Sequence, residues 1–230
     1  MIELTQVTKT FEARPAVSDV TVTFPTGSVT ALLGLNGAGK TTLLRLIAGL
    51  DRPDQGTVSV CGQRPSGNPQ LVGAHLGPGV GNPRHTVWRH LCWLAGLAGT
   101  ATAQAAEVLG ETGLHSARSE RIGGLSLGAR QRLAIASALL CRPRAVLFDE
   151  PLNGLDVLGV VWVRNLLRQL ADAGCTVVVA THMLGEVLLT ADRIAILDGG
   201  RLRVTSSLQD AIPTHAEGQR WLESELMECG

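Results

Sequence analysis

The chain has 230 residues, 45% of them hydrophobic, which is enough for one substantial core with an inserted subdomain. Its 20 acidic and 20 basic residues balance, so charge does not favour nucleic acid or anionic lipid as a partner. The five scattered cysteines form no C-x-x-C pair, which argues against a zinc site and is typical of reduced thiols in the cytosol. We find neither a signal peptide nor an apolar run long enough to cross a bilayer, and expect any membrane span to come from another polypeptide.

Two segments near the N-terminus predict antiparallel strands. Residues 20–24 alternate valine and phenylalanine with threonine, a period of two that suits a half-buried strand. Residues 58–60 follow turn signals at 53–56 and predict a second strand, so we expect a small side sheet. Upstream of both lies Phe11, one of three phenylalanines in a chain without tyrosine. It can stack on an adenine ring or simply pack within the protein.

A glycine-rich stretch between apolar segments fits G-x-x-x-x-G-K-[ST] at all four fixed positions. A buried strand is predicted at 30–33 before it and a helix at 43–50 after it, which is the context of a phosphate-binding P-loop. The loop N–H groups and the positive end of the helix would surround phosphate oxygens. We expect Lys40 to reach the β- and γ-phosphates and Thr41 to ligate Mg²⁺. The predicted nucleotide-binding residues are Gly34, Leu35, Asn36, Gly37, Ala38, Gly39, Lys40, Thr41 and Thr42.

The middle of the chain changes in character. Residues 71–99 are rich in glycine and contain two prolines, which predicts a mobile loop followed by an inserted helical region. Helices are expected at 87–97 and 102–109, with Thr102 as the cap of the second. Trp88 and Trp93 suit either a docking surface or ordinary packing between these helices.

Polar groups follow two further predicted strands. The apolar run 145–148 ends at Asp149 and Glu150, and the run 176–180 is followed by His182. Both runs suit strands buried on two faces, and a helical pattern between them predicts a βαβ unit. Since nucleotides bind at the carboxyl ends of such strands, Asp149 can hold Mg²⁺ and Glu150 can polarise the attacking water. His182 can contact the γ-phosphate, and with Lys40 and Glu150 it completes the predicted catalytic set; a solvated turn and a structural histidine are the alternatives.

These motifs resemble, in their order along the chain, the nucleotide-binding domain of an ABC transporter. The discriminating element is the stretch 125–132, which resembles the family's signature motif just before a helix. The likeness extends from Phe11 to about Arg203, and a short helix is expected beyond it at 219–227.

The resemblance implies an α/β fold, with a P-loop NTPase core built on a mainly parallel sheet, an antiparallel β side sheet and an inserted α-helical subdomain. We expect one ABC ATPase domain over 1–230. Within it the α-helical subdomain, which contains the signature motif, would occupy about 72–140, and a short C-terminal extension would occupy 206–230.

The resemblance also implies a mechanism in which two such domains, expected to be two copies of this chain, clamp two ATP molecules between them. Ser126 and the Gly128 backbone would contact the γ-phosphate bound to the opposite subunit, and Asp156 would lie at the dimer interface. Phe11 matches the position that stacks on adenine. A separate transmembrane permease subunit would dock on the inserted helices, which places the chain in the cytoplasm at the inner face of the cell membrane.

This sequence departs from the family pattern in its signature motif. Leu127 and Ala129 stand where the family usually has glycine and glutamine, but Ser126 and Gly128 remain, so the phosphate contacts can survive.

A second departure concerns the glutamine or glutamate that reaches magnesium and the attacking water in this family. Its position falls near Gly77, and no Gln, Glu or Asp occurs from Leu71 to Ala103. Either a water or one of three side chains must replace it, namely His75, Asn82 or His85. We therefore expect weaker magnesium coordination or altered coupling to the partner.

A single P-loop in a chain of this length resembles the separate ATPase subunit of bacterial exporters, particularly those of the ABC-2 type. The function implied is binding and hydrolysis of ATP, with Mg²⁺ as cofactor, to drive export by the permease. One alternative is a regulatory module that dimerises on ATP without transport. The other is a P-loop kinase of small molecules, which leaves the signature stretch and His182 unexplained.

Overall fold

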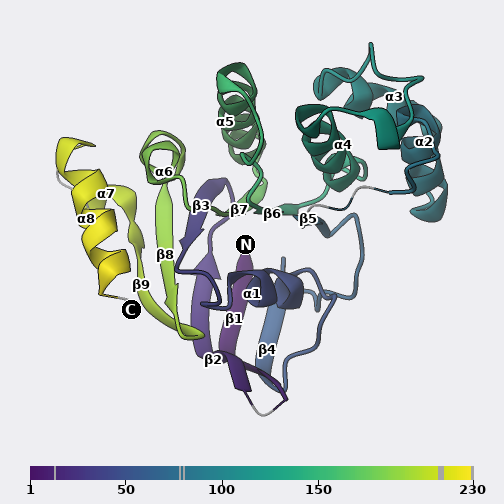
Figure 1. Ribbon diagram of the computed structural model, residues 1–230. Coiled ribbons are helices and arrows are strands. Elements are labelled where there is room, and N and C mark those ends of the chain that lie inside the picture. The colour runs from purple at the N-terminus through teal and green to yellow at the C-terminus, as the bar shows by residue number, and fades with distance from the viewer. Residues whose placement is uncertain (13, 78, 80, 212–214, 229–230) are drawn as a thin grey trace.

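Two β-sheets form the middle of the molecule, and helices cover both faces of the larger one (Figure 1). The computed structural model describes residues 1–12, 14–77, 79, 81–211 and 215–228. Within these residues, no helix is both long and apolar enough to cross a bilayer.

The larger sheet has six strands in the order β5-β6-β7-β3-β8-β9. The first five run parallel, and the edge strand β9 is antiparallel to β8. Their bounds are β3 (Ser28–Leu33), β5 (Val72–Leu76), β6 (Ala145–Asp149), β7 (Thr176–Ala180), β8 (Arg193–Asp198) and β9 (Arg201–Ser207). The central strands β3 and β7 are buried along their whole length, as continuous apolar runs covered on both faces should be. The predicted parallel core is confirmed.

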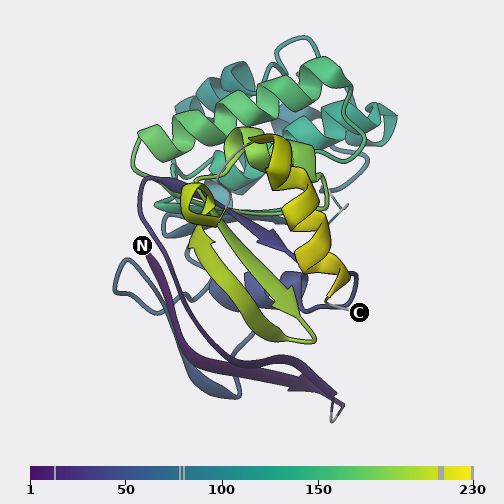
Figure 2. The same cartoon turned by 90° about the vertical axis from the view of Figure 1, so that its left-hand side faces the viewer.

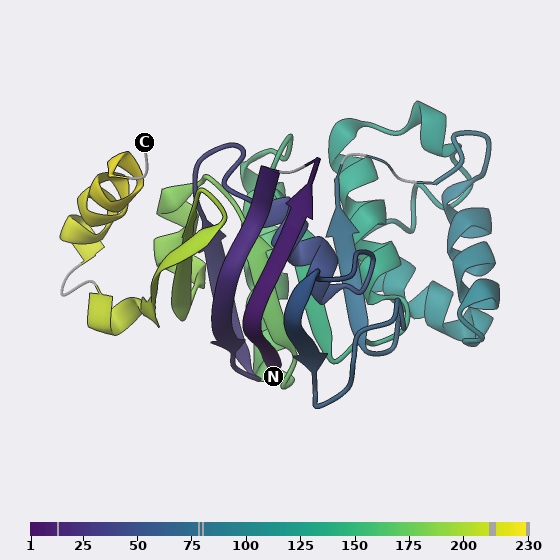
Figure 3. The same ribbon diagram turned by 90° about the horizontal axis from the view of Figure 1, so that it is seen from below.

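The smaller sheet is antiparallel, in the order β2-β1-β4. Its strands are β1 (Ile2–Phe11), β2 (Arg14–Phe24) and β4 (Gln55–Val60). In β2 the valines and phenylalanine at 20–24 are buried and the threonines exposed, which confirms the predicted alternation. Seen from below, this sheet lies across the larger one with helix α1 (Lys40–Ile47) beside it (Figure 3). The sequence did not single out β1, which pairs with both other strands.

Three helices cover the upper face of the larger sheet in Figure 1: α4 (Leu127–Leu139), α5 (Val157–Asp172) and α6 (Leu184–Thr190). Beside them, α2 (Val87–Leu97), α3 (Thr102–Glu111) and the short 3₁₀ helix η1 (Ile122–Gly124) share a separate apolar core with α4. The chain ends in α7 (Leu208–Ala211) and α8 (His215–Met227). Figure 2 shows α8 in front of β8 and β9, and the Leu222 side chain of α8 is fully buried.

The helix after the P-loop lies three residues earlier than predicted. It ends at Ile47 because Gly49, at φ 71°, stops it. The Gly49 N–H donates to the Leu46 carbonyl and the Leu50 N–H to the Arg45 carbonyl, the paired bonds of a Schellman motif. The apolar run on which the prediction of a helix at 43–50 rests therefore continues past the end of α1.

Two predictions for the middle of the chain were wrong. Residues 72–76 of the expected loop form β5, because Val72, Ala74 and Leu76 pack in one apolar cluster with α1, while Gly73 lets the strand approach α4 closely. Thr102 does not cap α3: the cap is the extended Ala101, and no side chain bonds the helix start. Helix α2 has the predicted bounds, and α3 runs to Glu111.

Some sequence predictions lie partly outside the described residues. Pro78 and Val80 of the expected loop are among these, as are residues 212–214 of the expected C-terminal extension and Cys229. The helix predicted at 219–227 is confirmed within α8. The division of the chain at 72–140 and 206–230 stays a prediction.

Candidate functional site

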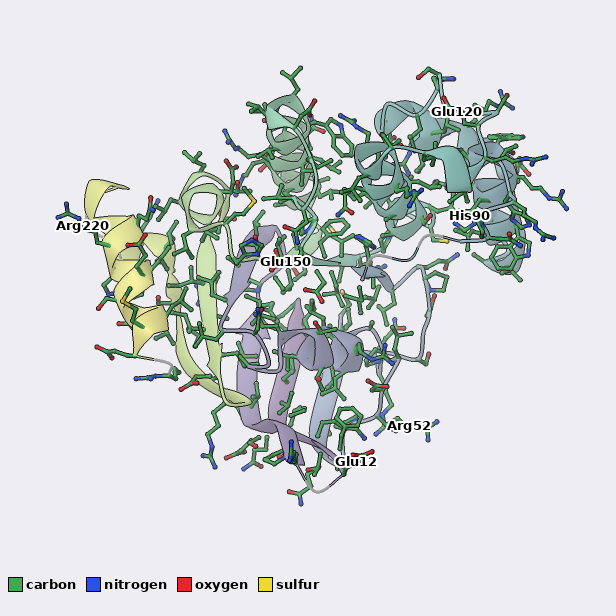
Figure 4. The ribbon with its side chains drawn as sticks, in the orientation of Figure 1. Glu12, Arg52, His90, Glu120, Glu150 and Arg220 are labelled. Atoms are coloured by element: carbon green, nitrogen blue, oxygen red, sulfur yellow. The ribbon has the colours of Figure 1, made fainter. Side chains whose placement is uncertain are left out.

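A cavity of about 640 Å³ lies where the P-loop meets the carboxyl ends of the parallel strands. The P-loop side of the cavity is formed by Asn36, Gly37, Ala38, Gly39, Lys40, Thr41 and Thr42. The opposite side includes His75, Gly77, Gln131, Asp149 and Glu150. Figure 4 shows Glu150 near the centre of the molecule, at the level of the sheet and between α1 and the upper helices.

The P-loop presents free backbone donors to this cavity. Helix α1 begins at Lys40, and no side chain bonds its first N–H groups, whereas side chains cap α2, α4 and α5. An uncapped helix start is a binding site for anions. Gly39 has φ 104°, and a Cβ there would lie 2.2 Å from the Ala16 carbonyl oxygen, so only glycine fits the turn.

Lys40 lies across the loop. Its Nζ donates to the carbonyls of Gly34 at 2.6 Å and Leu35 at 3.1 Å. Burial lowers the pKa of Lys40, while the nearby carboxylates of Glu150 and Asp149 act in the opposite direction. Gly34 and Leu35 therefore hold Lys40 through their backbone and do not themselves line the cavity, unlike the other predicted P-loop residues.

The residues that could hold Mg²⁺ are already together. The Thr41 hydroxyl donates to Asp149 Oδ2 at 2.6 Å, across the cavity from helix to strand. Hydroxyl and carboxylate oxygens suit Mg²⁺, which takes few protein ligands and completes its shell with phosphate and water. No group of three or more His, Cys, Asp or Glu in the described part of the chain could hold a metal by itself. The donor set therefore fits Mg²⁺ held jointly with a nucleotide.

Glu150 and His182 face each other from neighbouring strand ends. His182 Nδ1 lies 2.9 Å from Glu150 Oε2, and the His182 side chain is 67% exposed. By distance this is an ion pair, yet Glu150 Oε2 is buried and accepts no hydrogen bond of acceptable geometry from the described residues. A buried acceptor without a donor is unfavourable in a resting protein and suits one that receives a water. The structure thus brings together the two groups that follow the apolar runs at 145–148 and 176–180, and their catalytic roles stay a prediction.

Ser126, Gly128 and Asp156 lie in a second cavity, of about 500 Å³. Ser126 Oγ accepts from the Ala129 N–H and so caps α4, while Asp156 Oδ1 accepts from the Gly159 N–H and caps α5. This cavity shares Gly154 with the first but none of the P-loop residues. Ser126 and Gly128 therefore do not line the cavity of the chain's own P-loop, although Leu127, Arg130 and Gln131 of the same stretch do.

Phe11 stands apart from both cavities. It ends β1, is 47% exposed, and has Lys9 Nζ at 5.4 Å from its ring centroid. Figure 4 labels the next residue, Glu12, at the far end of the smaller sheet. Stacking of Phe11 on adenine stays a prediction.

The family model described as ABC transporter matches residues 17–153. The chain belongs to the ABC transporter family. The uncharacterized ABC transporter ATP-binding protein YhcH of Bacillus subtilis (strain 168) is 36% identical to it, over 91% of this chain and 71% of that protein. The bacitracin transport ATP-binding protein BcrA of Enterococcus faecalis is 33% identical, over 99% of this chain and 75% of that protein. The Fe(3+) ions import ATP-binding protein FbpC of Pseudomonas fluorescens is 38% identical, over 87% of this chain and 60% of that protein.

Solved structures of ABC ATP-binding subunits have the same fold. The ATP-binding subunit of an ABC transporter matches with a TM-score of 0.88 and 27% identity, over 99% of both chains. The dimeric post-hydrolysis state of the ATP-binding cassette MJ0796, bound to ADP and Pi, matches with a TM-score of 0.83 and 26% identity, over 90% of this chain and 98% of that one. Our chain is therefore an ATP-binding subunit with an ABC ATPase domain.

Among the three side chains considered as substitutes for the family's glutamine, only His75 lines the nucleotide cavity in the described part of this ABC subunit. Asn82 accepts from the Arg84 N–H, and His85 lies edge-on to Trp93, both outside that cavity. Gly77 itself lines the cavity with φ 126°, a conformation that residues with a side chain rarely adopt.

Sequence reasoning missed Gln131. It lies in the quoted signature stretch, is 9% exposed, and lines the nucleotide cavity of this ABC subunit. The available signal was the helical spacing that puts Gln131 on the same face as Ile135 and Leu139, four and eight residues later.

Proposed function

We propose that this ABC ATP-binding subunit dimerises around two ATP molecules, hydrolyses them with the help of Mg²⁺, and so powers export by a separate transmembrane subunit. The observation that carries the proposal is the meeting, in one cavity, of the P-loop with Lys40, the Thr41–Asp149 pair and Glu150. Each supplies a part that phosphoryl transfer to water requires.

In this proposal the loop N–H groups and Lys40 hold the β- and γ-phosphates. Thr41 and Asp149 hold Mg²⁺, which when bound neutralises charge on the phosphates. Glu150 accepts the proton of the attacking water, since its carboxylate stands at the strand end and lines the same cavity as the P-loop. His182, 2.9 Å away, orients the Glu150 carboxylate and the γ-phosphate.

Dimerisation follows from the separation of the two cavities. Ser126 and Gly128 stand at the start of α4 and line a cavity that contains none of the P-loop residues. The positive end of this helix attracts an anion, although Ser126 Oγ already accepts from one of its N–H groups. We infer that this anion is the γ-phosphate held by a second copy, with Asp156 beside it at the interface. The dimeric state of a solved relative at 26% identity supports the inference.

Export is the direction that we favour, although the relatives include an importer of Fe(3+) ions. The bacitracin transport protein matches over 99% of this chain, and our sequence resembles ABC-2-type subunits. The permease would dock on the helical region that contains α2 and α3, which places the chain in the cytoplasm at the inner membrane face. Glycine at position 77 predicts weaker magnesium coordination or altered coupling to that permease.

The first experiment tests the nucleotide-bound dimer. Purified Glu150→Gln is analysed by size-exclusion chromatography with light scattering, with and without saturating Mg·ATP. We expect a dimer only with the nucleotide, because ATP binds but is not removed. Glu223→Gln, on the exposed side of α8, is the matched control and should behave as wild type. A Glu150→Gln chain that stays monomeric contradicts the proposal.

The second experiment separates a transport motor from a regulatory module. ATP turnover is measured for wild type and Glu150→Gln, alone and in vesicles reconstituted with a candidate permease of about six hydrophobic spans. A motor hydrolyses ATP faster with its permease and cargo. Turnover that ignores the membrane protein would favour the regulatory module.

A further inference from the structure

The backbone of Glu150 adopts a conformation that residues with a side chain rarely take. Its φ is 52° at the end of β6. Such a backbone conformation costs on the order of 1–3 kcal/mol and persists only where neighbouring contacts hold it. Two contacts do so here. The Glu150 N–H donates to the Ala180 carbonyl at 2.8 Å, and Gln131 Nε2 donates to the Glu150 carbonyl at 3.4 Å. The direction of the Glu150 side chain therefore depends on Gln131 as well as on the sheet.

Gln131 reaches Glu150 from α4, the helix that begins after Ser126. A buried amide needs hydrogen-bond partners. One end of the Gln131 amide has the Glu150 carbonyl at 3.4 Å, and Gln131 lines the nucleotide cavity together with His75. A polar contact thus joins α4 to the backbone of Glu150, in addition to the apolar packing of this helix on the sheet.

His75 comes from β5, the strand next to β6. It pairs in register with Phe148, one residue before the level of Asp149. It is 7% exposed, and burial lowers the pKa of its imidazole while the bond to Gln131 opposes this. A neutral imidazole has one donor and one acceptor nitrogen, which suits an amide partner. His75 also lines a smaller cavity between β5 and α2, so it lies between the helical region and the nucleotide cavity.

We propose that Gln131, which lies in the same cavity as His75, is a positioning residue that aims Glu150 and links it to the helix start at Ser126. The proposal rests on the proposed function, in which Glu150 activates water and Ser126 contacts the nucleotide of the opposite subunit. At 3.4 Å the contact is longer than a typical N–H···O bond, and such contacts tighten when a reactive complex forms. A shift of α4 as Ser126 meets that nucleotide therefore changes how firmly Glu150 is held. In this chain the nucleotide cavity thus contains a glutamine from α4, Gln131, as well as the glycine at position 77.

The first test removes the donor. Gln131→Met keeps an unbranched side chain of similar length but cannot donate to Glu150. For the full chain, we expect kcat for ATP hydrolysis to fall about 10- to 100-fold, since a misplacement of about 1 Å has effects of this size. KM for ATP should stay within about twofold, because the phosphate contacts are untouched. Gln169→Met, on the exposed side of α5, is the matched control and should keep the wild-type kcat.

The second test holds the volume of His75 and changes its hydrogen bonding. His75→Leu cannot bond the Gln131 amide, whereas His75→Gln can. We expect a several-fold lower kcat in the first and recovery in the second, both with unchanged KM. His90→Leu removes another buried histidine, one on α2 without a contact to Glu150, and should keep the wild-type kcat.

The outcomes separate this proposal from the proposed function. It is overturned if Gln131→Met keeps the wild-type kcat, if KM rises as much as kcat falls, or if His75→Leu and His75→Gln are equal. Should Gln131→Met fail to fold, the two His75 variants decide alone. Wild-type protein without ATPase activity, or Glu150→Gln without an ATP-dependent dimer, refutes the proposed function instead. Gln131→Met in the Glu150→Gln background should still dimerise in Mg·ATP.

Discussion

Asp156 has a structural role that its predicted place at a dimer interface does not require. Its Oδ1 accepts from the Gly159 N–H at 2.7 Å and caps the 16-residue helix α5. Loss of such a cap costs about 1 kcal/mol, and loss of a negative charge at a helix start adds about 0.3–1 kcal/mol. Asp156→Ala should therefore lower the free energy of unfolding by about 1–2 kcal/mol, which for a chain of this size lowers Tm by about 2–8 °C.

Two further variants divide that effect. Asp156→Ser keeps an oxygen that can cap α5 and should lose only the charge contribution, about 0.3–1 kcal/mol. Asp172→Ala removes an aspartate from the last turn of the same helix, where its ion pair with Arg168 is exposed and 3.6 Å long. Since a negative charge is unfavourable at a helix C-terminus, Asp172→Ala should not lower Tm. Thermal unfolding without nucleotide measures all three, and an Asp156→Ala chain that melts with the wild type would refute the capping argument.

Three other predictions concern the P-loop, a buried histidine and a buried thiol. Gly39→Ala should abolish ATP binding measured by calorimetry, because the new Cβ would lie 2.2 Å from the Ala16 carbonyl oxygen. In Gly37→Ala the new Cβ meets nothing within 4 Å, so this variant should bind ATP more weakly than wild type but measurably. Equal ATP affinities of the two variants would contradict this. Burial lowers the pKa of His90 below its ordinary value of 6.5, so the unfolded chain takes up the proton first as the pH falls. The urea concentration at the unfolding midpoint should therefore decrease when the pH is lowered from about 7.5 to about 5.5, and decrease less in His90→Gln. The same pH dependence in both chains would refute this. Burial raises the pKa of Cys175 from 9.0 to about 11, which leaves about 100-fold less thiolate, so mass spectrometry should find it alkylated by iodoacetamide in urea but not in native buffer.

The parts of the fold that the sequence predicted are those with one strong local cause. The runs at 145–148 and 176–180 are continuous and apolar because their strands are covered on both faces, and the P-loop needs glycine at fixed places. Strand β5 was missed because glycine and proline nearby indicate a loop, whereas Gly73 serves the close approach of the strand to the Ala138 carbonyl of α4. Local composition does not distinguish these two uses of glycine.

The candidate site divides in the same way. Polar groups at the ends of neighbouring parallel strands must lie close together, so Glu150 and His182 could be predicted as partners. Gln131 could not, because helical periodicity says which face of α4 is buried but not which backbone group that face will meet. The contact with Glu150 depends on the packing of a helix against a strand that follows it in the sequence, and such long-range contacts leave no local pattern.

The buried Leu222 of α8 connects the C-terminal helix to α6, the helix that follows His182. This side chain belongs to the same apolar cluster as Val187 and Leu188 of α6, and α6 begins two residues after His182. Removing α8 would expose that cluster to solvent. Helix α6 would then be held less firmly, and so would the His182 side chain just before it. A truncated chain should consequently hydrolyse ATP poorly even though none of the lost residues lies near a phosphate.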